Sequence, residues 1–153
     1  AFFANRVMSS KRPSFESYLG WLGLSSEAPP VEILARTGGV RATDTFHLVE
    51  TFEPVNGRAE GVFFVSGVRY KDSDWRSLQP GQELHLLDDP ANPANAKAIL
   101  LTKDGVEVGW VPDWLVDNVH EFRTAARQLS VAVEQVNPDA PLHLAVQCRL
   151  IVA

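Results

Sequence analysis

Apolar residues near the start of the chain recur at helical spacing, and further on they alternate with polar residues as in strands. Phe15, Leu19 and Leu22 lie four and three positions apart, which predicts one apolar face of a short helix. Gly23 follows directly, and glycine commonly ends a helix because it adopts a positive φ without strain. The first expected element is therefore a helix that ends near Gly23.

The pattern from this helix to residue 59 predicts a β-hairpin. Residues 31–35 form a mostly apolar segment of strand length, and residues 45–52 show partial alternation, so both are expected to be strands. Residues 36–44 then form the connecting turn, and residues 54–58 are a second break. We expect residues 1–59 to be an extension, a helix followed by a hairpin, that packs on the rest of the chain.

From residue 60 onward, short apolar runs separated by turn residues predict a mainly β structure. Asp104-Gly105 lies between two such runs and is typical of a tight hairpin turn. One helical turn is expected over residues 73–78. The expected strands are residues 61–68, 83–87, 97–102, 106–111, 130–136 and 143–152.

One longer helix is expected to begin after Pro112, with Asp113 as its N-cap. Its apolar face is formed by Trp114, Leu115, Val119, Phe122 and Ala126. Strict alternation places one set of side chains of the last strand on a shared face: Leu142, Leu144, Val146, Cys148, Leu150 and Val152. Several short strands with one capping helix predict an α+β architecture, with a small, partly closed β-barrel in residues 60–153.

Composition excludes several classes of protein. The chain has 153 residues, of which 45% are apolar and 22% charged, too apolar a composition for a disordered tail. No apolar run reaches the roughly 18–20 residues that a membrane span needs. Because Cys148 is the single cysteine, no internal disulfide can form, and a reducing cytoplasm is the expected location.

Charge is unevenly distributed along the chain, whose net charge is −5. Nine Lys and Arg balance nine Asp and Glu through residue 80, whereas five face ten from residue 81 onward. Proteins that coat a phosphate backbone usually carry a basic surplus, so this chain is not expected to do so. Basic residues for an anion-binding face come from the first half: Arg6, Lys11, Arg12, Arg36, Arg41, Arg58, Arg69, Lys71 and Arg76.

Signals of catalysis are weak. The four histidines, the single cysteine and the adjacent Asp88 and Asp89 form no zinc- or calcium-site spacing. Gly38-Gly39 is part of neither a phosphate loop nor a dinucleotide fingerprint, and it forms either a hairpin turn or an anion-holding backbone nest beside Arg36 and Arg41. We therefore expect no enzyme activity, no metal and no cofactor; a hydrolase that uses an unrecognised acid pair is the weakest class considered.

The richest stretch of candidate chemistry runs from Gly67 to Pro112. Arg69-Tyr70-Lys71 places a guanidinium, an aromatic ring and an ammonium together, as suits a terminal nucleotide whose base stacks and whose phosphate meets charge. Asn92 and Asn95 lie in a proline-stiffened loop and either fix its turns or point amides outward. Taken alone, these features also fit an edge aromatic residue and ordinary turn chemistry.

Three blocks in this order carry a family resemblance: G-V-R-Y from Gly67, D-P-x-N-P-x-N-x-x-A-I from Asp89 and D-G-x-x-x-G-W-V-P from Asp104. Residues 60–152 resemble the HIRAN domain, a module of Rad-five-type helicases that also occurs alone in bacterial proteins. The resemblance implies an OB/SH3-like barrel with one or two helices and a pocket for the 3′-hydroxyl end of single-stranded DNA. It implies that Arg69 and Tyr70 lie on a β-strand and hold DNA, with the tyrosine stacking on a base. It also implies that Asn92 lies near the terminal nucleotide.

Three positions depart from the DNA-binding members of that family. Ala94 stands in place of a second stacking aromatic residue, and Asn95 in place of an aspartate that accepts the 3′-hydroxyl. Asp113 stands where a lysine would meet phosphate. The lost aromatic platform removes roughly 1–3 kcal/mol of stacking, and the carboxylate opposes phosphate binding.

The sequence thus predicts a non-enzymatic module that recognises the end of single-stranded DNA and does not associate with a membrane. The candidate binding residues are Arg69, Tyr70, Lys71, Asn92, Asn95 and Trp110, with Arg36 and Arg41 as outlying phosphate contacts. The alternative is a protein-interaction module that keeps the barrel and has lost the DNA pocket. Trp110 and Trp114 would then contribute to a peptide groove, and the acidic second half would suit a basic protein partner.

Overall fold

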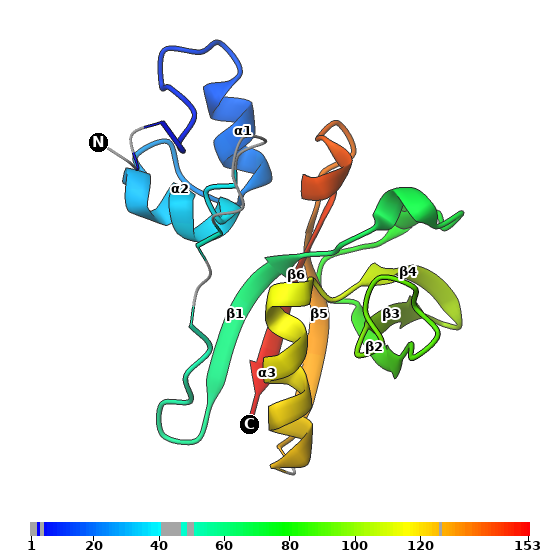
Figure 1. Cartoon of the computed structure of the whole chain (residues 1–153). Helices are drawn as coiled ribbons and strands as arrows, with labels where there is room; N and C mark the ends of the chain where they lie inside the picture. Colours follow the sequence, from blue (N-terminus) through cyan, green and yellow to red (C-terminus); the bar gives the residue numbers. More distant parts are fainter. Residues whose placement is uncertain (1–2, 4, 41–46, 49–50, 126) are drawn as a thin grey trace. The chain divides into compact units, whose positions relative to one another are not determined.

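The computed structural model describes residues 3, 5–40, 47–48, 51–125 and 127–153 of the chain. The chain forms two compact units, Ala1–Thr51 and Phe52–Ala153, and each is described by itself (Figure 1). That residues 1–59 pack on the remainder stays a prediction.

The described part of the first unit contains two helices. α1 (Phe15–Trp21) confirms the predicted helix, with Leu19 and Leu22 buried. Gly23 has a φ of +70°, and Leu24 donates its backbone N–H to the carbonyl of Leu19 at 2.9 Å. A left-handed glycine therefore ends α1, as its position in the sequence predicted.

The predicted strand at residues 31–35 is wrong, because α2 (Pro30–Thr37) occupies this segment. Pro30 lies in the first turn, where a missing N–H costs nothing, and Glu32 faces the positive end of the helix dipole. Gly38 ends the helix with a φ of +71° and donates its N–H to Leu34 at 2.9 Å. The predicted hairpin lacks its first strand. Of the second, residues 45–52, half lie outside the described residues, and the described residues 47, 48, 51 and 52 are not in a strand.

The second unit is built on one antiparallel sheet with the strand order β1-β6-β5-β2-β3-β4. The strands are β1 (Ala59–Phe64), β2 (Glu83–Asp88), β3 (Ile99–Lys103), β4 (Val106–Trp110), β5 (Leu129–Val136) and β6 (Val146–Val152). The helical elements are η1 (Val68–Tyr70), η2 (Trp75–Ser77), α3 (Asp113–Thr124) and η3 (Leu142–Leu144). An α+β fold with a curved sheet and few helices is confirmed.

The two ends of the sheet approach each other at a single point. Ser66, just beyond β1, donates its N–H to Trp110 of β4 and accepts one in return, both at 2.8 Å. Gly109 permits this approach, because a Cβ there would lie 2.5 Å from the carbonyl oxygen of Ser66. The sheet is not a closed ladder, and this bridge makes it a partly closed barrel.

α3 carries an apolar face into the barrel core, where Leu115, Val119 and Phe122 are buried as predicted. Ala126, expected on the same face, lies outside the described residues. Asp113 is not the N-cap; it is the first helical residue and follows Pro112, which caps the helix without a side-chain bond. The Asp113 carboxylate instead accepts a hydrogen bond from Asn95.

Several predicted strands end earlier or begin later than expected. β1 stops at Phe64, because the chain turns at Gly67 with a φ of +69° and enters η1. β6 begins only at Val146, because Leu142–Leu144 forms a 3₁₀ helix that leaves Leu142 exposed. The predicted helical turn at 73–78 contains η2, and from Val146 onward the predicted apolar face is buried.

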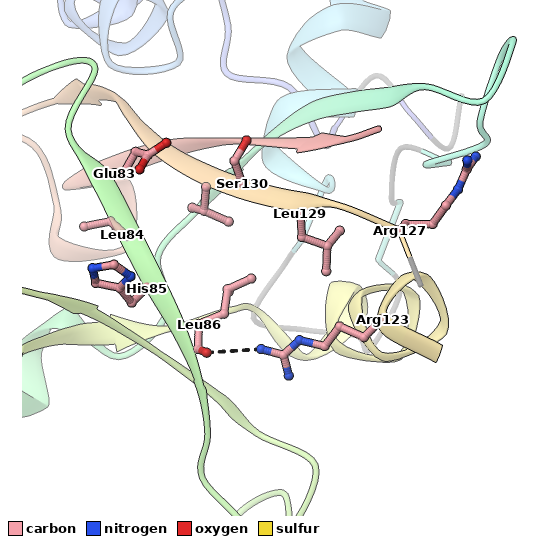
Figure 2. A pocket seen from close by; sticks show the side chains of 9 residues that line it. Glu83, Leu84, His85, Leu86, Arg123, Arg127, Leu129 and Ser130 are labelled. Atoms are coloured by element: carbon pink, nitrogen blue, oxygen red, sulfur yellow. Dashed lines mark hydrogen bonds between the residues drawn. The ribbon is translucent and has the colours of Figure 1, made fainter. Parts of the chain in front are cut away.

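One ladder of the barrel is short, and a pocket opens beside it. β2 and β5 pair only at Glu83↔Ala132 and Leu84↔Val131. A pocket of about 360 Å³ lies where they separate, bounded also by Arg123 of α3 (Figure 2). Among the described helices, none has the length and apolar character needed to cross a membrane.

Candidate nucleic-acid interface

Arg69 and Tyr70 lie on η1, a short turn at the surface, and not on a strand as predicted. The positive φ of Gly67 starts this turn, which the N–H of Tyr70 closes on the Gly67 carbonyl at 2.9 Å. Tyr70 is 67% exposed. The Arg69 guanidinium lies 4.6 Å from the centre of the Tyr70 ring and donates a hydrogen bond to its hydroxyl. The pair therefore presents an aromatic surface with a positive charge beside it.

Trp110 packs directly against the start of η1. A Cβ on Gly67 would lie 2.6 Å from Cε3 of the Trp110 ring, so only glycine allows this contact. The Lys71 ammonium lies 4.1 Å from the centre of the same ring and forms an ion pair with Glu107. Lys71 follows Arg69 and Tyr70 in the chain, and its charge is already matched by Glu107.

Asp89 links Trp110 to the loop of residues 89–98, here called the asparagine loop. Its Oδ2 accepts a hydrogen bond from Nε1 of Trp110 at 2.9 Å and one from Nδ2 of Asn92 at 3.3 Å. From the sequence, Asp89 was considered only with Asp88 as a pair of cation ligands, and their spacing fits no cation site. The signal that could have identified it is the partly buried indole N–H, which normally needs an acceptor.

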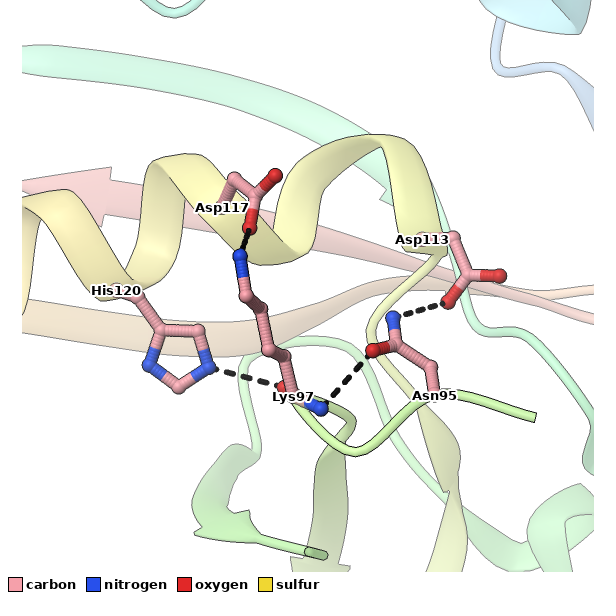
Figure 3. Close-up of polar contacts among 5 residues, drawn as sticks. All are labelled: Asn95, Lys97, Asp113, Asp117 and His120. Carbon is pink, nitrogen blue, oxygen red and sulfur yellow. Dashed lines mark hydrogen bonds and ion pairs between the residues drawn. The ribbon is translucent and has the colours of Figure 1, made fainter. Parts of the chain in front are cut away.

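Both loop asparagines fix turns of the loop. This is one of the two interpretations that the sequence allowed, the other being that their amides point outward. Oδ1 of Asn92 accepts the backbone N–H groups of Ala94 at 3.0 Å and Asn95 at 3.3 Å. Oδ1 of Asn95 accepts the N–H of Lys97 at 2.9 Å, and its Nδ2 donates to Oδ1 of Asp113 at 3.0 Å (Figure 3). Both asparagine amides are therefore held in fixed orientations.

Acidic groups of α3 line the other side of the asparagine loop. Asp113 meets Asn95, and Asp117 forms an ion pair with the Lys97 ammonium at 3.0 Å (Figure 3). His120 donates from Nε2 to the Lys97 carbonyl at 2.9 Å, which ties the end of the loop to the helix. The site thus has a cationic end at Arg69 and an anionic end at Asp113.

η3 contacts η1, the turn that carries Arg69 and Tyr70. Leu142 of η3 is exposed, as is Tyr70 of η1. Leu142 was expected on the buried face of a strand, and the 3₁₀ turn after Pro141 changes its direction.

The outlying phosphate candidates lie apart from this group in the sequence. Arg36 is in the last turn of α2, within the first unit, and Arg41 lies outside the described residues. Gly38 and Gly39 both have positive φ, but they end α2 and do not turn a hairpin. The carbonyl of Gly39 accepts a hydrogen bond from Nη1 of the buried Arg6 at 2.8 Å.

The described residues contain no cluster of three or more His, Cys, Asp or Glu able to hold a metal ion. Burial raises the pKa of the Cys148 thiol, and that side chain is fully buried in the core. Desolvation lowers the pKa of His143, which favours its neutral form. Neither group lies in an arrangement that suits nucleophilic chemistry.

Comparison with known proteins places the barrel in a family. The family model of the HIRAN domain matches residues 60–153. The crystal structure of the HIRAN domain of human HLTF matches with a TM-score of 0.49 and 19% identity, covering 63% of this chain and 74% of that one. A Lactobacillus plantarum protein matches with a TM-score of 0.48 and 17% identity, covering 63% and 97%. No curated protein sequence matches. The match over residues 60–153 shows that this chain belongs to the HIRAN domain family.

Proposed function

We propose that residues 60–153 bind the 3′ end of single-stranded DNA at η1 and the asparagine loop. HIRAN domains in general are DNA-binding modules. The observation that carries the proposal is the exposed Tyr70 ring with the Arg69 guanidinium held against it. A base stacks on such a ring for roughly 1–3 kcal/mol, and the guanidinium meets the adjoining phosphate.

The polarity of the site supports recognition of an end rather than of a continuous backbone. Phosphate is favoured near Arg69, whereas Asp113 and Asp117 repel it at the far side of the asparagine loop. A strand that ends there presents a neutral hydroxyl, which Asn95 or Asp113 can accept. The strand therefore runs with its phosphates toward Arg69 and its last sugar toward the loop.

The remaining predicted residues support this arrangement indirectly. Asn92 and Trp110 converge on Asp89, so they fix the loop next to η1. Lys71 neutralises Glu107 and strengthens the Trp110 contact. Arg36 and Arg41 stay candidates for a phosphate further along the strand. In this proposal the module acts by binding, without catalysis or a cofactor.

The alternative, a tryptophan-lined peptide groove, has less support. In the described part of Phe52–Ala153, Tyr70 is the only aromatic side chain among the exposed large apolar residues. Trp75 is buried, and Trp110 and Trp114 are partly covered. An exposed aromatic patch away from Tyr70, which such a groove needs, is absent from this described part.

Fluorescence anisotropy with 5′-labelled single-stranded oligonucleotides tests the proposal. A free 3′-hydroxyl should bind more tightly than a 3′-phosphate, because the added charge meets Asp113. Tyr70→Ala should weaken binding roughly 5- to 150-fold, the equivalent of about 1–3 kcal/mol of stacking. Arg58→Ala, which removes an exposed arginine with one long contact to Glu60, is the control and should change little. Equal binding of both ends, or none at high micromolar DNA, contradicts the proposal.

A further inference from the structure

The ladder between β2 and β5 stops while both strands continue. β2 pairs with β3 as far as Asp88, and β5 pairs with β6 from Leu129. The next two pairs in the β2–β5 register would be His85 opposite Ser130 and Leu86 opposite Leu129, and neither is formed. Leu86 and Leu129 both line the pocket in the gap (Figure 2).

Both strands turn backbone hydrogen-bonding groups into this gap. Asp89 donates its backbone N–H to the Ala98 carbonyl, on the β3 side, at 2.8 Å. Because the backbone groups of successive residues point to opposite edges of a strand, those of Leu86, three residues earlier, point into the gap. Gln128 exchanges two backbone bonds with Ala153 on the β6 side, so Leu129 faces the gap from the other strand. The gap is thus edged by two strands that lack a partner between them.

The Arg123 side chain makes one of the hydrogen bonds that a neighbouring strand would make to β2. Its Nη2 donates to the Leu86 carbonyl at 3.2 Å, a long bond, and its Nη1 pairs with Asp88 at 2.5 Å. Figure 2 shows the side chain reaching from α3 to the β2 edge. A backbone N–H from another segment would make the same bond to Leu86 at a shorter distance.

The rim of the pocket carries a cation that has no counter-ion among the described residues. Of the five Lys and Arg after residue 80, four are paired: Lys97 with Asp117, Lys103 with Asp104, Arg123 with Asp88 and Arg149 with Glu134. Arg127 forms no ion pair or side-chain hydrogen bond within the described part of the chain. It borders the pocket at the end opposite Glu83, and its guanidinium points away from the gap, toward the turn at Gly57 (Figure 2).

We propose that this pocket binds a short extended peptide segment with an acidic side chain. The peptide backbone pairs with Leu86 and Leu129, as in strand addition to an open sheet edge. Its alternate side chains contact Leu84 and Val131, and its carboxylate pairs with Arg127, whose side chain turns from Gly57 toward the gap on binding. A volume of about 360 Å³ is at the lower end for a ligand pocket, which limits the bound segment to a few residues.

The test uses a blocked pentapeptide, acetyl-Thr-Val-Asp-Val-Thr-amide, with amide signals of the whole chain followed by NMR. The Leu86 and Leu129 amides should shift on titration. A matched peptide with asparagine in place of aspartate should bind roughly two- to fivefold more weakly, the range expected for one exposed ion pair. Replacing the first valine by proline should abolish the Leu86 and Leu129 shifts, because proline lacks the N–H.

Variants separate charge pairing from backbone pairing. Arg127→Gln should remove the preference for aspartate while the Leu86 and Leu129 shifts remain. Arg149→Gln, an arginine of β6 paired with Glu134, is the control and should keep the preference. Equal affinity for the aspartate and asparagine peptides, unchanged shifts with the proline peptide, shifts confined to η1, or displacement by inorganic phosphate would each overturn the proposal. Tyr70→Ala should leave peptide binding unchanged, which separates this site from the DNA site.

Discussion

Asn95 and Asp113 decide which chemical groups can approach the asparagine loop. Asn95 accepts from the Lys97 backbone and donates to Asp113, so its amide is held and Asp113 keeps one carboxylate oxygen toward solvent. Two oxygen acceptors at this position favour a hydroxyl and disfavour a phosphate. In the proposed site, Asp113 therefore favours an uncharged strand end over a phosphorylated one.

Asp113→Asn tests this charge effect at the residue scale. The asparagine oxygen can still accept from Asn95, so the loop stays in place while the negative charge is lost. DNA affinity at low salt should rise roughly two- to fivefold, and the gain should shrink as salt increases. Anisotropy at two salt concentrations measures it, with Asp104→Asn at the β3–β4 turn as the control. An unchanged or lower affinity at low salt would show that Asp113 does not repel the strand.

The elements that carry the site depend on a few backbone positions. η1 exists because Gly67 takes a positive φ and lets Trp110 pack against it. The asparagine loop is held at both ends, by Asp89 on Trp110 and by His120 on Lys97. Changes at these positions therefore move whole elements rather than single side chains.

Gly67→Ala should destabilise the barrel by more than backbone strain alone. An L-residue in the left-handed region costs about 1–2 kcal/mol, and here the new Cβ would also lie 2.6 Å from Trp110. Gly81→Ala is the matched control, because Gly81 has a φ of +87° and open space around it. Urea unfolding should show a larger loss of the free energy of unfolding for Gly67→Ala. Equal losses for the two variants would mean that the Trp110 contact does not hold η1.

The sequence predicted elements well wherever a local signal was strong. Asp104-Gly105 has positive φ at both residues and turns the β3–β4 hairpin, and the alternation of residues 146–152 places the core face correctly. The strand predicted for residues 31–35 is wrong, because a short, mostly apolar segment fits a strand or a buried helical turn equally. Pro30 and Gly38 stand at positions typical of the two ends of a helix, and they favour the helix that forms.

Part of the candidate site could not be predicted, because its contacts join distant segments. Lys71 pairs with Glu107 across 36 positions, and Asn95 meets Asp113 across 18. Such contacts depend on the register of the barrel. The local pattern indicated which residue types form the candidate site. The fold determines which of these side chains already have a partner within the chain.

At the scale of the whole molecule, the chain is a HIRAN barrel with a separate helical unit before it. The acidic surplus after residue 80 lies partly along the asparagine loop, at Asp113 and Asp117, where the proposed strand ends. An acidic net charge is therefore compatible with DNA binding that is restricted to one end. The proposed peptide pocket lies between β2 and β5, whereas the proposed DNA site lies at η1 and the asparagine loop.

An NMR titration with a short single-stranded oligonucleotide that has a free 3′-hydroxyl tests the central claim most directly. The account predicts shifts at the Trp110 indole N–H, the Asn95 side-chain amide and the Tyr70 backbone amide. The same signals should shift much less with a 3′-phosphorylated oligonucleotide of identical sequence. Shifts that avoid these three groups, or that are the same for both oligonucleotides, would contradict recognition of a 3′ end at this site.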